Sequence, residues 1–162
     1  MNMLKSHRGR SIHLIDIENQ LGTPFFVAEA VNGWFEDYAR LANYQLGDLV
    51  VVGTTARATV WEIERSAVPC RKLFRLGPDG ADRVLQEVMW DENLPARFDR
   101  IVCASGDGGF TDVVAALGAA GGCVVVVSRL SCLSKRLRMA AGEVIVLPEN
   151  RFYTPPTARQ AA

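Results

Sequence analysis

The sequence predicts an α/β domain built on a single doubly wound, mostly parallel sheet flanked by helices. Six short apolar runs rich in β-branched residues recur along the 162-residue chain, as expected for strands buried on both faces. Helical patterns separate these runs, and alternation of strand and helix from end to end favours a parallel sheet. The predicted strands cover residues 11–16, 48–53, 70–74, 100–105, 122–128 and 143–147.

The helical patterns follow from apolar or small residues that recur at helical spacing. Thr23 and Pro24 are suited to the N-cap and first turn of the first helix. Asp79 is suited to cap a later one, and Ser131 or Ser134 the last. The predicted helices cover residues 24–41, 59–66, 80–93, 110–121 and 135–142.

Length and composition indicate one globular domain. With 49% hydrophobic and 22% charged residues, the chain is long enough to bury its own core. We expect the domain at residues 11–150, between flexible ends at 1–10 and 151–162. The formal net charge is zero, which excludes a global basic field that would attract nucleic acid.

The same features predict a cytoplasmic protein. No apolar stretch approaches the roughly 20 residues of a membrane span, so we expect no membrane partner. The basic N-terminus is not followed by a secretory core. The cysteines have no C-x-x-C spacing and lie in or beside apolar runs, so we expect buried free thiols in a reducing compartment. They are Cys70, Cys103, Cys123 and Cys132.

Acidic residues stand at the ends of two predicted strands. Asp16 closes the first strand, and Asp107 follows the fourth between Gly106 and Gly108, which let the backbone turn sharply. Right-handed crossovers place the β-to-α loops at one edge of the sheet, where sites form at the carboxyl ends of strands. In this topology the first and fourth strands should be neighbours where the strand order reverses. Asp16 and Asp107 are therefore expected to converge, although an Asx-type turn is an alternative role for Asp16.

A third acid, Asp82, lies in the first turn of the helix at 80–93. It either favours the helix dipole or joins the other two acids. Carboxylates held a few Å apart repel each other unless a proton or cation lies between them, and Mg²⁺ and Mn²⁺ prefer such oxygen ligands. We see no obvious partner for His7 or His13 in a nucleophilic triad.

These segments together resemble the NYN domains, a branch of the PIN-like ribonucleases that includes LabA-like proteins. The matching pieces are LIDIEN, GADRVL and SGDGGFTDVV, with a weaker match in LSKRLRMAAGEVIVL. In order and spacing they cover residues 11–147. The resemblance implies a PIN-like, Rossmannoid fold and an endoribonuclease that hydrolyses RNA phosphodiester bonds with a water activated by Mg²⁺ or Mn²⁺.

The resemblance also implies the roles of individual residues. Asp16, Asp82 and Asp107 match the metal-binding acids, while Asn19 and Ser105 would position a ligand, water or phosphate. Glu18 would either assist from behind the site or face solvent. Thr111 is a further substrate-binding candidate and Asp112 a further metal ligand, although either residue would also suit a helix N-cap. A homo-oligomer is compatible with the sequence.

Two departures from the family pattern leave a second function open. Gly109 stands where such families commonly carry a fourth acid, and Gly142 where an acid often follows the last helix. The alternative function is a catalytically degenerate PIN-like module that binds RNA or a nucleotide. A receiver-like signalling domain shares the acids, but it would need a lysine at a late strand end.

Two basic clusters are candidate contacts for an RNA backbone. One comprises Arg71, Lys72 and Arg75. The other comprises Lys135, Arg136 and Arg138, on a helix that we expect to end near the acidic rim. A solvated helix face is the alternative for each cluster. The three tryptophans fall in helical patterns and are predicted to be core residues rather than base-stacking platforms: Trp34, Trp61 and Trp90.

Overall fold

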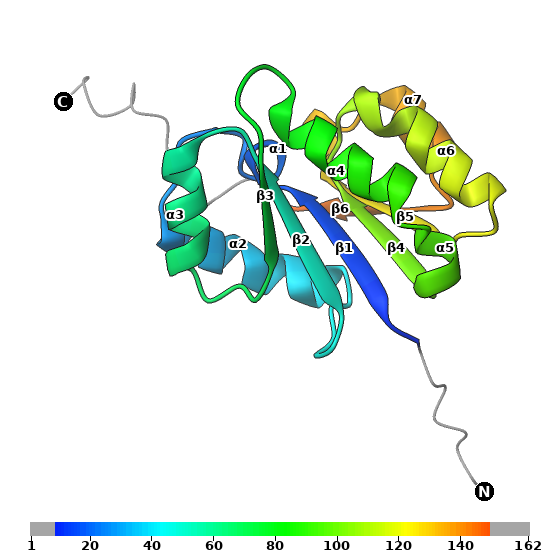
Figure 1. Ribbon diagram of the computed structural model, residues 1–162, viewed down its shortest axis with the longest axis horizontal. Coiled ribbons are helices and arrows are strands. Elements are labelled where there is room, and N and C mark those ends of the chain that lie inside the picture. The colour runs from blue at the N-terminus through cyan, green and yellow to red at the C-terminus, as the bar shows by residue number, and fades with distance from the viewer. Residues whose placement is uncertain (1–8, 150–162) are drawn as a thin grey trace, which may run out of the picture.

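The computed structural model describes residues 9–149, and within them six strands form one sheet. All neighbouring strands are parallel, in the order β3-β2-β1-β4-β5-β6 (Figure 1). This confirms the predicted fold class. The strands are β1 (Ser11–Asp16), β2 (Leu49–Thr54), β3 (Arg71–Phe74), β4 (Arg100–Ala104), β5 (Val124–Arg129) and β6 (Glu143–Leu147).

Helices cover both faces of the sheet, as Figure 1 shows. One face carries α1 (Ile17–Leu21), α2 (Ala28–Leu41) and α3 (Arg57–Arg65), and the other carries α4 (Gly80–Asp91), α5 (Leu94–Arg97), α6 (Thr111–Ala119) and α7 (Lys135–Ala140). Each face has its own hydrophobic core, because the side chains of a strand alternate between the two faces. On β1, Leu14 packs into one core and Ile15 into the other.

The strand order reverses at the centre of the sheet, beside β1. β1 pairs with β2 on one side and with β4 on the other, and Ile15 lies opposite Ala104 in the register with β4. The residues that follow these two strands therefore emerge next to each other at the same edge. This is the crevice in which open α/β sheets place their sites.

The helix that follows β1 differs from the prediction. The chain forms the short helix α1 directly after Asp16, and α2 begins only at Ala28, with Val27 at its N-cap. Thr23 does not cap α2: its Oγ1 accepts a hydrogen bond from the Phe25 N–H at 3.0 Å and forms a local turn. A helix of five residues is too short to produce a periodic apolar pattern, which explains why the sequence did not indicate it.

Two other predicted caps occupy the N-cap position without capping through their side chains. Asp79 precedes α4 in the left-handed conformation, at φ 56°, and Ser134 precedes α7. Neither side chain makes a cap hydrogen bond. Helix position was therefore predictable at these two ends, whereas the capping contact was not.

Two of the three tryptophan predictions were wrong. Trp34 is buried on α2, but Trp61 on α3 and Trp90 on α4 are 67% and 53% exposed. A single aromatic residue on an amphipathic helix fits either side of the apolar stripe, so spacing alone did not fix its face.

The cysteines are all free thiols, as predicted, but they are not all buried. Cys103 is buried in β4, Cys70 and Cys132 are half-buried, and Cys123 is exposed before β5. Within residues 9–149, no helix is long and apolar enough to cross a membrane. Apart from Gly9 and Arg10, the ends predicted as flexible lie outside the described residues.

Candidate functional site

Asp16 is a buried carboxylate at the carboxyl end of β1. Its side chain is at the N-cap of α1, where Oδ1 accepts a hydrogen bond from the Asn19 N–H at 3.2 Å. Its Oδ2 accepts a second one from the Ser105 hydroxyl at 3.0 Å. The residue is only 4% exposed. The local contact of this carboxylate is therefore a helix N-cap and not the Asx-type turn that the sequence offered as an alternative, and the same carboxylate also faces the loop after β4.

Ser105 connects Asp16 to the Asp107 loop. Its hydroxyl donates to Asp16 and accepts a hydrogen bond from the Asp107 N–H at 3.2 Å. The residue is 1% exposed. The sequence predicted that Ser105 positions a ligand. In the structure its hydroxyl is buried and fixes the orientation of Asp16.

Asp82, in the first turn of α4, makes a hydrogen bond with Asp16 across the crevice. Burial, the charge of Asp16 and this hydrogen bond, followed by the charge of Asp107, raise the pKa of Asp82 to about 8. Burial also raises the pKa of Asp16, although its own hydrogen bonds oppose the rise. At neutral pH the pair of carboxyl groups therefore keeps a proton between them.

Asp107 completes the set of predicted acids. It is exposed, and its Oδ1 accepts a hydrogen bond from the Gly109 N–H at 2.7 Å. The chain approaches this loop closely: a Cβ at Gly106 would collide with the carbonyl oxygen of Cys132. The glycine before Asp107 is therefore required by close packing of the backbone.

Position 109 faces the acids. A Cβ placed on Gly109 would lie 3.0 Å from Oδ1 of Asp107 and 3.9 Å from Oδ2 of Asp82. The departure from the family pattern that the sequence indicated thus falls at the acidic crevice itself. A side chain at this position would therefore be in tight contact with Asp107 and close to Asp82.

The three acids are brought together, but they are not already arranged as a closed ligand set. Among the described residues, no group of three or more His, Cys, Asp or Glu side chains is placed to hold a metal ion. The contacts give a physical reason, because Asp82 is hydrogen-bonded to Asp16 while Asp107 is turned toward Gly109. Mutual repulsion is relieved in this arrangement by a proton.

Three consecutive polar residues of α1 make hydrogen bonds to β2, to the loop after β4 and to β5. Glu18 accepts hydrogen bonds from the hydroxyl of Thr54, the last residue of β2, at 2.9 Å and from the Thr55 N–H at 2.8 Å. Asn19 Oδ1 accepts the Gly106 N–H at 3.0 Å. The next residue, Gln20, donates from Nε2 to the carbonyl of Val127 in β5 at 3.0 Å. The sequence predicted a site role for Asn19 but did not indicate this frame.

Thr111 and Asp112 begin α6, but neither is its N-cap. Phe110 holds that position. The Thr111 hydroxyl donates to the carbonyl of Gly108 at 2.6 Å and closes the turn after Asp107. Asp112 is exposed, and its Oδ1 lies 3.9 Å from a guanidinium nitrogen of Arg136. The capping alternative was therefore wrong for both residues.

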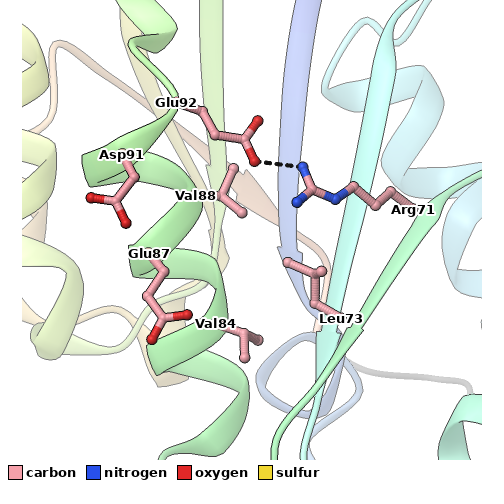
Figure 2. A pocket seen from close by; sticks show the side chains of 7 residues that line it. All are labelled: Arg71, Leu73, Val84, Glu87, Val88, Asp91 and Glu92. Atoms are coloured by element: carbon pink, nitrogen blue, oxygen red, sulfur yellow. Dashed lines mark hydrogen bonds and ion pairs between the residues drawn. The ribbon is translucent and has the colours of Figure 1, made fainter.

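The first basic cluster is compensated by acids. Arg71 pairs with Glu92 at 2.6 Å (Figure 2) and Lys72 pairs with Glu64 at 2.6 Å. Arg75 makes a bidentate pair with Glu87 at 2.6 and 3.0 Å. Figure 2 shows the groove between β3 and α4 that Arg71 lines together with three carboxylates: Glu87, Asp91 and Glu92. This groove is therefore unsuited to a phosphate.

The second basic cluster begins beside the acidic crevice. The Ser134 N–H donates to the carbonyl of Gly106 at 2.8 Å, which places the start of α7 against the Asp107 loop. Lys135 and Arg136 follow and are exposed. The expectation that this helix ends near the rim was wrong, because a helix that follows a parallel strand begins at the carboxyl edge.

His13 has partners that sequence reasoning missed. Its Nδ1 lies 2.7 Å from the Tyr38 hydroxyl and its Nε2 lies 3.3 Å from Oδ2 of Asp48. The histidine is fully buried. Its partners come from α2 and the loop before β2, so no local sequence signal linked the three. The arrangement ties β1 to its neighbours and presents no nucleophile to solvent.

Together these features define an α/β protein with a doubly wound parallel sheet and an acidic crevice at its switch point. A crystal structure of a protein of unknown function from Vibrio parahaemolyticus is similar to the chain, with a TM-score of 0.57 and 16% sequence identity. The match covers 91% of this chain and 98% of that one. No family model and no curated protein matches. At this identity, the likeness supports the fold alone.

Proposed function

We propose that the protein is an endoribonuclease that depends on Mg²⁺ or Mn²⁺ and hydrolyses RNA phosphodiester bonds. The observation that carries this proposal is the convergence of Asp16, Asp82 and Asp107 from three separate segments onto the switch point. Structural roles in helix caps and turns account for each acid singly. They do not account for two carboxylates in hydrogen-bond contact with a third nearby.

The donor chemistry fits a hard divalent cation. The three side chains offer carboxylate oxygens, the ligands that Mg²⁺ and Mn²⁺ prefer. The pKa of Asp82 is raised first by burial and then by the negative charges of Asp16 and Asp107, which an ion would neutralise. Asp16, Asp82 and Asp107 are the residues that would hold it. When bound, such an ion activates water and offsets the charge that develops on a phosphoryl oxygen.

Neighbouring residues support this assignment. Ser105 and the Asn19 N–H each engage one oxygen of Asp16 and so fix its orientation. Lys135 and Arg136 extend from the start of α7, beside the Asp107 loop, where cations would bind an RNA backbone without reading its sequence.

The test is metal-dependent cleavage by the Asp107→Asn variant. We expect the wild-type protein to cut RNA when Mg²⁺ or Mn²⁺ is present and the variant to lose at least about two orders of magnitude in rate, because a ligand carboxylate is removed. Quantitative gel assays of a labelled RNA measure the rate. Asp91→Asn, which changes an exposed acid at the far end of α4, is the matched control. Equal metal-dependent rates in wild type and Asp107→Asn would remove the proposed site.

The second candidate is a catalytically inactive module that binds RNA or a nucleotide without cleaving it. The absence of a carboxylate at Gly109, where the family pattern has an acid, favours this candidate. Robust cleavage of RNA by the wild-type protein with metal would eliminate it.

The Gly109→Asp variant separates the two candidates further. If the missing acid limits activity, we expect the variant to cut RNA faster than wild type by about tenfold or more, because it adds a carboxylate beside Asp107 and Asp82. The measurement is the initial cleavage rate at saturating Mn²⁺, with Gly109→Asn as an uncharged control of similar size. A rise in both variants would show that charge is not the cause.

A further inference from the structure

Gln86 lies beside the acidic crevice, and the resemblance gives it no role. It is on α4, four residues after Asp82, so the two side chains lie on the same face of the helix. A Cβ built on Gly109 would lie 3.7 Å from Nε2 of Gln86. The same point lies within 4 Å of Oδ1 of Asp107 and Oδ2 of Asp82. One amide and two carboxyl groups therefore lie next to the backbone of Gly109.

The amide group differs from its surroundings in two respects. It is neutral, so it adds nothing to the repulsion among the acids, and its nitrogen carries two hydrogens that can be donated. Within residues 9–149, no hydrogen bond engages the Gln86 side chain, whereas Glu87 next to it is held by Arg75. Gln86 is half-buried, so its amide is both positioned by the helix and open to a ligand.

A phosphate that enters this crevice needs such a donor. Its oxygens are negatively charged. The carboxylate of Asp107, and that of Asp82 once it has lost its proton, repel them unless a positive or hydrogen-bonding group offsets the repulsion. Because Gly109 has no side chain, a phosphate oxygen can reach van der Waals contact with its backbone. An acid at that position would both fill the space and strengthen the repulsion.

We propose that Gln86 is a substrate-binding residue that donates its Nε2–H to a non-bridging oxygen of a phosphodiester seated over Gly109. This inference rests on the proposed function, since it names the residue that would receive the phosphate beside the metal-binding acids. It also gives Gly109 a role: the glycine forms the floor of the phosphate position.

Two substitutions test whether the hydrogen-bond donor and the neutrality of the Gln86 side chain matter for binding. Gln86→Met keeps the length of the side chain and removes the donor, so KM for RNA should rise about tenfold while kcat changes little, as expected for loss of one hydrogen bond to a charged group. Gln86→Glu replaces the donor with a carboxylate, so KM should rise further. Glu87→Gln is the matched control on the outer face of α4 and should keep the wild-type KM.

The affinity for Mn²⁺, measured by electron paramagnetic resonance on the same variants, provides a second readout. We expect Gln86→Met to bind Mn²⁺ within about twofold of wild type, because the acids are untouched. A weaker affinity in Gln86→Met would make the amide a metal ligand and overturn the proposal. An unchanged KM in both Gln86 variants, with circular dichroism showing wild-type folding, would also overturn it.

Measurements on the wild-type protein distinguish failure of the proposed function from failure of the role of Gln86 alone. If it neither binds Mn²⁺ nor cuts RNA, the proposed function fails and the role of Gln86 fails with it. If it does both and the two Gln86 variants behave like wild type, the role of Gln86 alone is rejected.

Discussion

Asp16 and Asp82 hold their carboxyl groups in hydrogen-bond contact in the crevice, and the protein tolerates this because one of them keeps its proton. Two ionised carboxylates at this separation would be strongly unfavourable in a partly dry site. A fold selected for stability alone has no need for such a pair, since an amide at either position would make the same hydrogen bond without the charge. Pairs of this kind are typical of sites in which a cation takes the place of the proton.

The raised pKa of Asp82 predicts how the stability of the metal-free protein depends on pH. The carboxyl has a pKa of about 8 in the folded state and 3.8 as its ordinary value, so the folded protein binds this proton more tightly than the unfolded chain does. The free energy of unfolding should therefore fall as the pH rises from about 4 to about 8. Asp82→Asn should flatten this decline, which urea denaturation at several pH values measures.

The control for this experiment is Asp91→Asn, which changes an exposed acid at the other end of α4. It should keep the wild-type decline with pH. The ordinary and folded-state pKa values of Asp82 bracket the range in which stability should fall. A wild-type free energy of unfolding that stays level between about pH 5 and about pH 8 would contradict the retained proton.

At the level of residues, the sequence located the three acids because each follows a strong local signal. Asp16 ends an apolar strand, Asp107 stands between glycines, and Asp82 opens a helical pattern. Gln86 was missed because its role depends on the loop at Gly109, which is distant in sequence. The ion pairs that occupy the Arg71–Arg75 cluster were missed for the same reason: their partners lie on α3 and α4 and in the residue after α4.

At the level of elements, α1 is the part that links the sheet to the site. It starts at Asp16 and its polar residues reach the ends of β2 and β5 and the loop after β4. Glu18 makes the most extensive of these contacts, since its carboxylate receives the hydroxyl and the N–H of Thr55 as well as the hydroxyl of Thr54. The sequence reading left Glu18 either behind the site or in solvent, and the structure gives it this bracing contact.

Removal of this contact should destabilise the protein measurably. Glu18→Ala leaves the Thr55 N–H and two hydroxyls without their acceptor, so we expect the free energy of unfolding to fall by about 1–3 kcal/mol. Chemical denaturation measures the difference. Glu29→Ala, which removes an exposed acid in the first turn of α2, should cost less than about 1 kcal/mol. Equal losses in the two variants would contradict the bracing role.

The sequence predicted all six strands and failed mainly at short or irregular elements. Each strand is a run of apolar residues that needs no distant partner to be recognised. In contrast, α1 has five residues and α5 has four, which is less than two turns of helix and too little for a periodic signal. The start of α2 was placed too early because Thr23 and Pro24 resemble a helix cap but form a turn.

At the level of the whole molecule, the order of the strands determines where the acids lie. Because β1 is central and pairs with β4, the residues after these strands meet at the switch point, and α4 returns from the β3 edge to present Asp82 to them. Two cores, one on each face, hold this arrangement. The convergence of Asp16 and Asp107 followed from topology, whereas the hydrogen bond between Asp16 and Asp82 depended on packing that the sequence did not specify.

The most direct test of the central claim is the anomalous diffraction of a crystal of the full-length protein soaked in Mn²⁺ at a pH above 8. We expect an anomalous peak within coordination distance of carboxylate oxygens of Asp16 and Asp107, and of Asp82 after it loses its proton, at about 2.0–2.3 Å. A well-diffracting soaked crystal that shows no peak between these carboxylates, or shows Asp82 still hydrogen-bonded to Asp16 with Mn²⁺ bound elsewhere, would contradict the account.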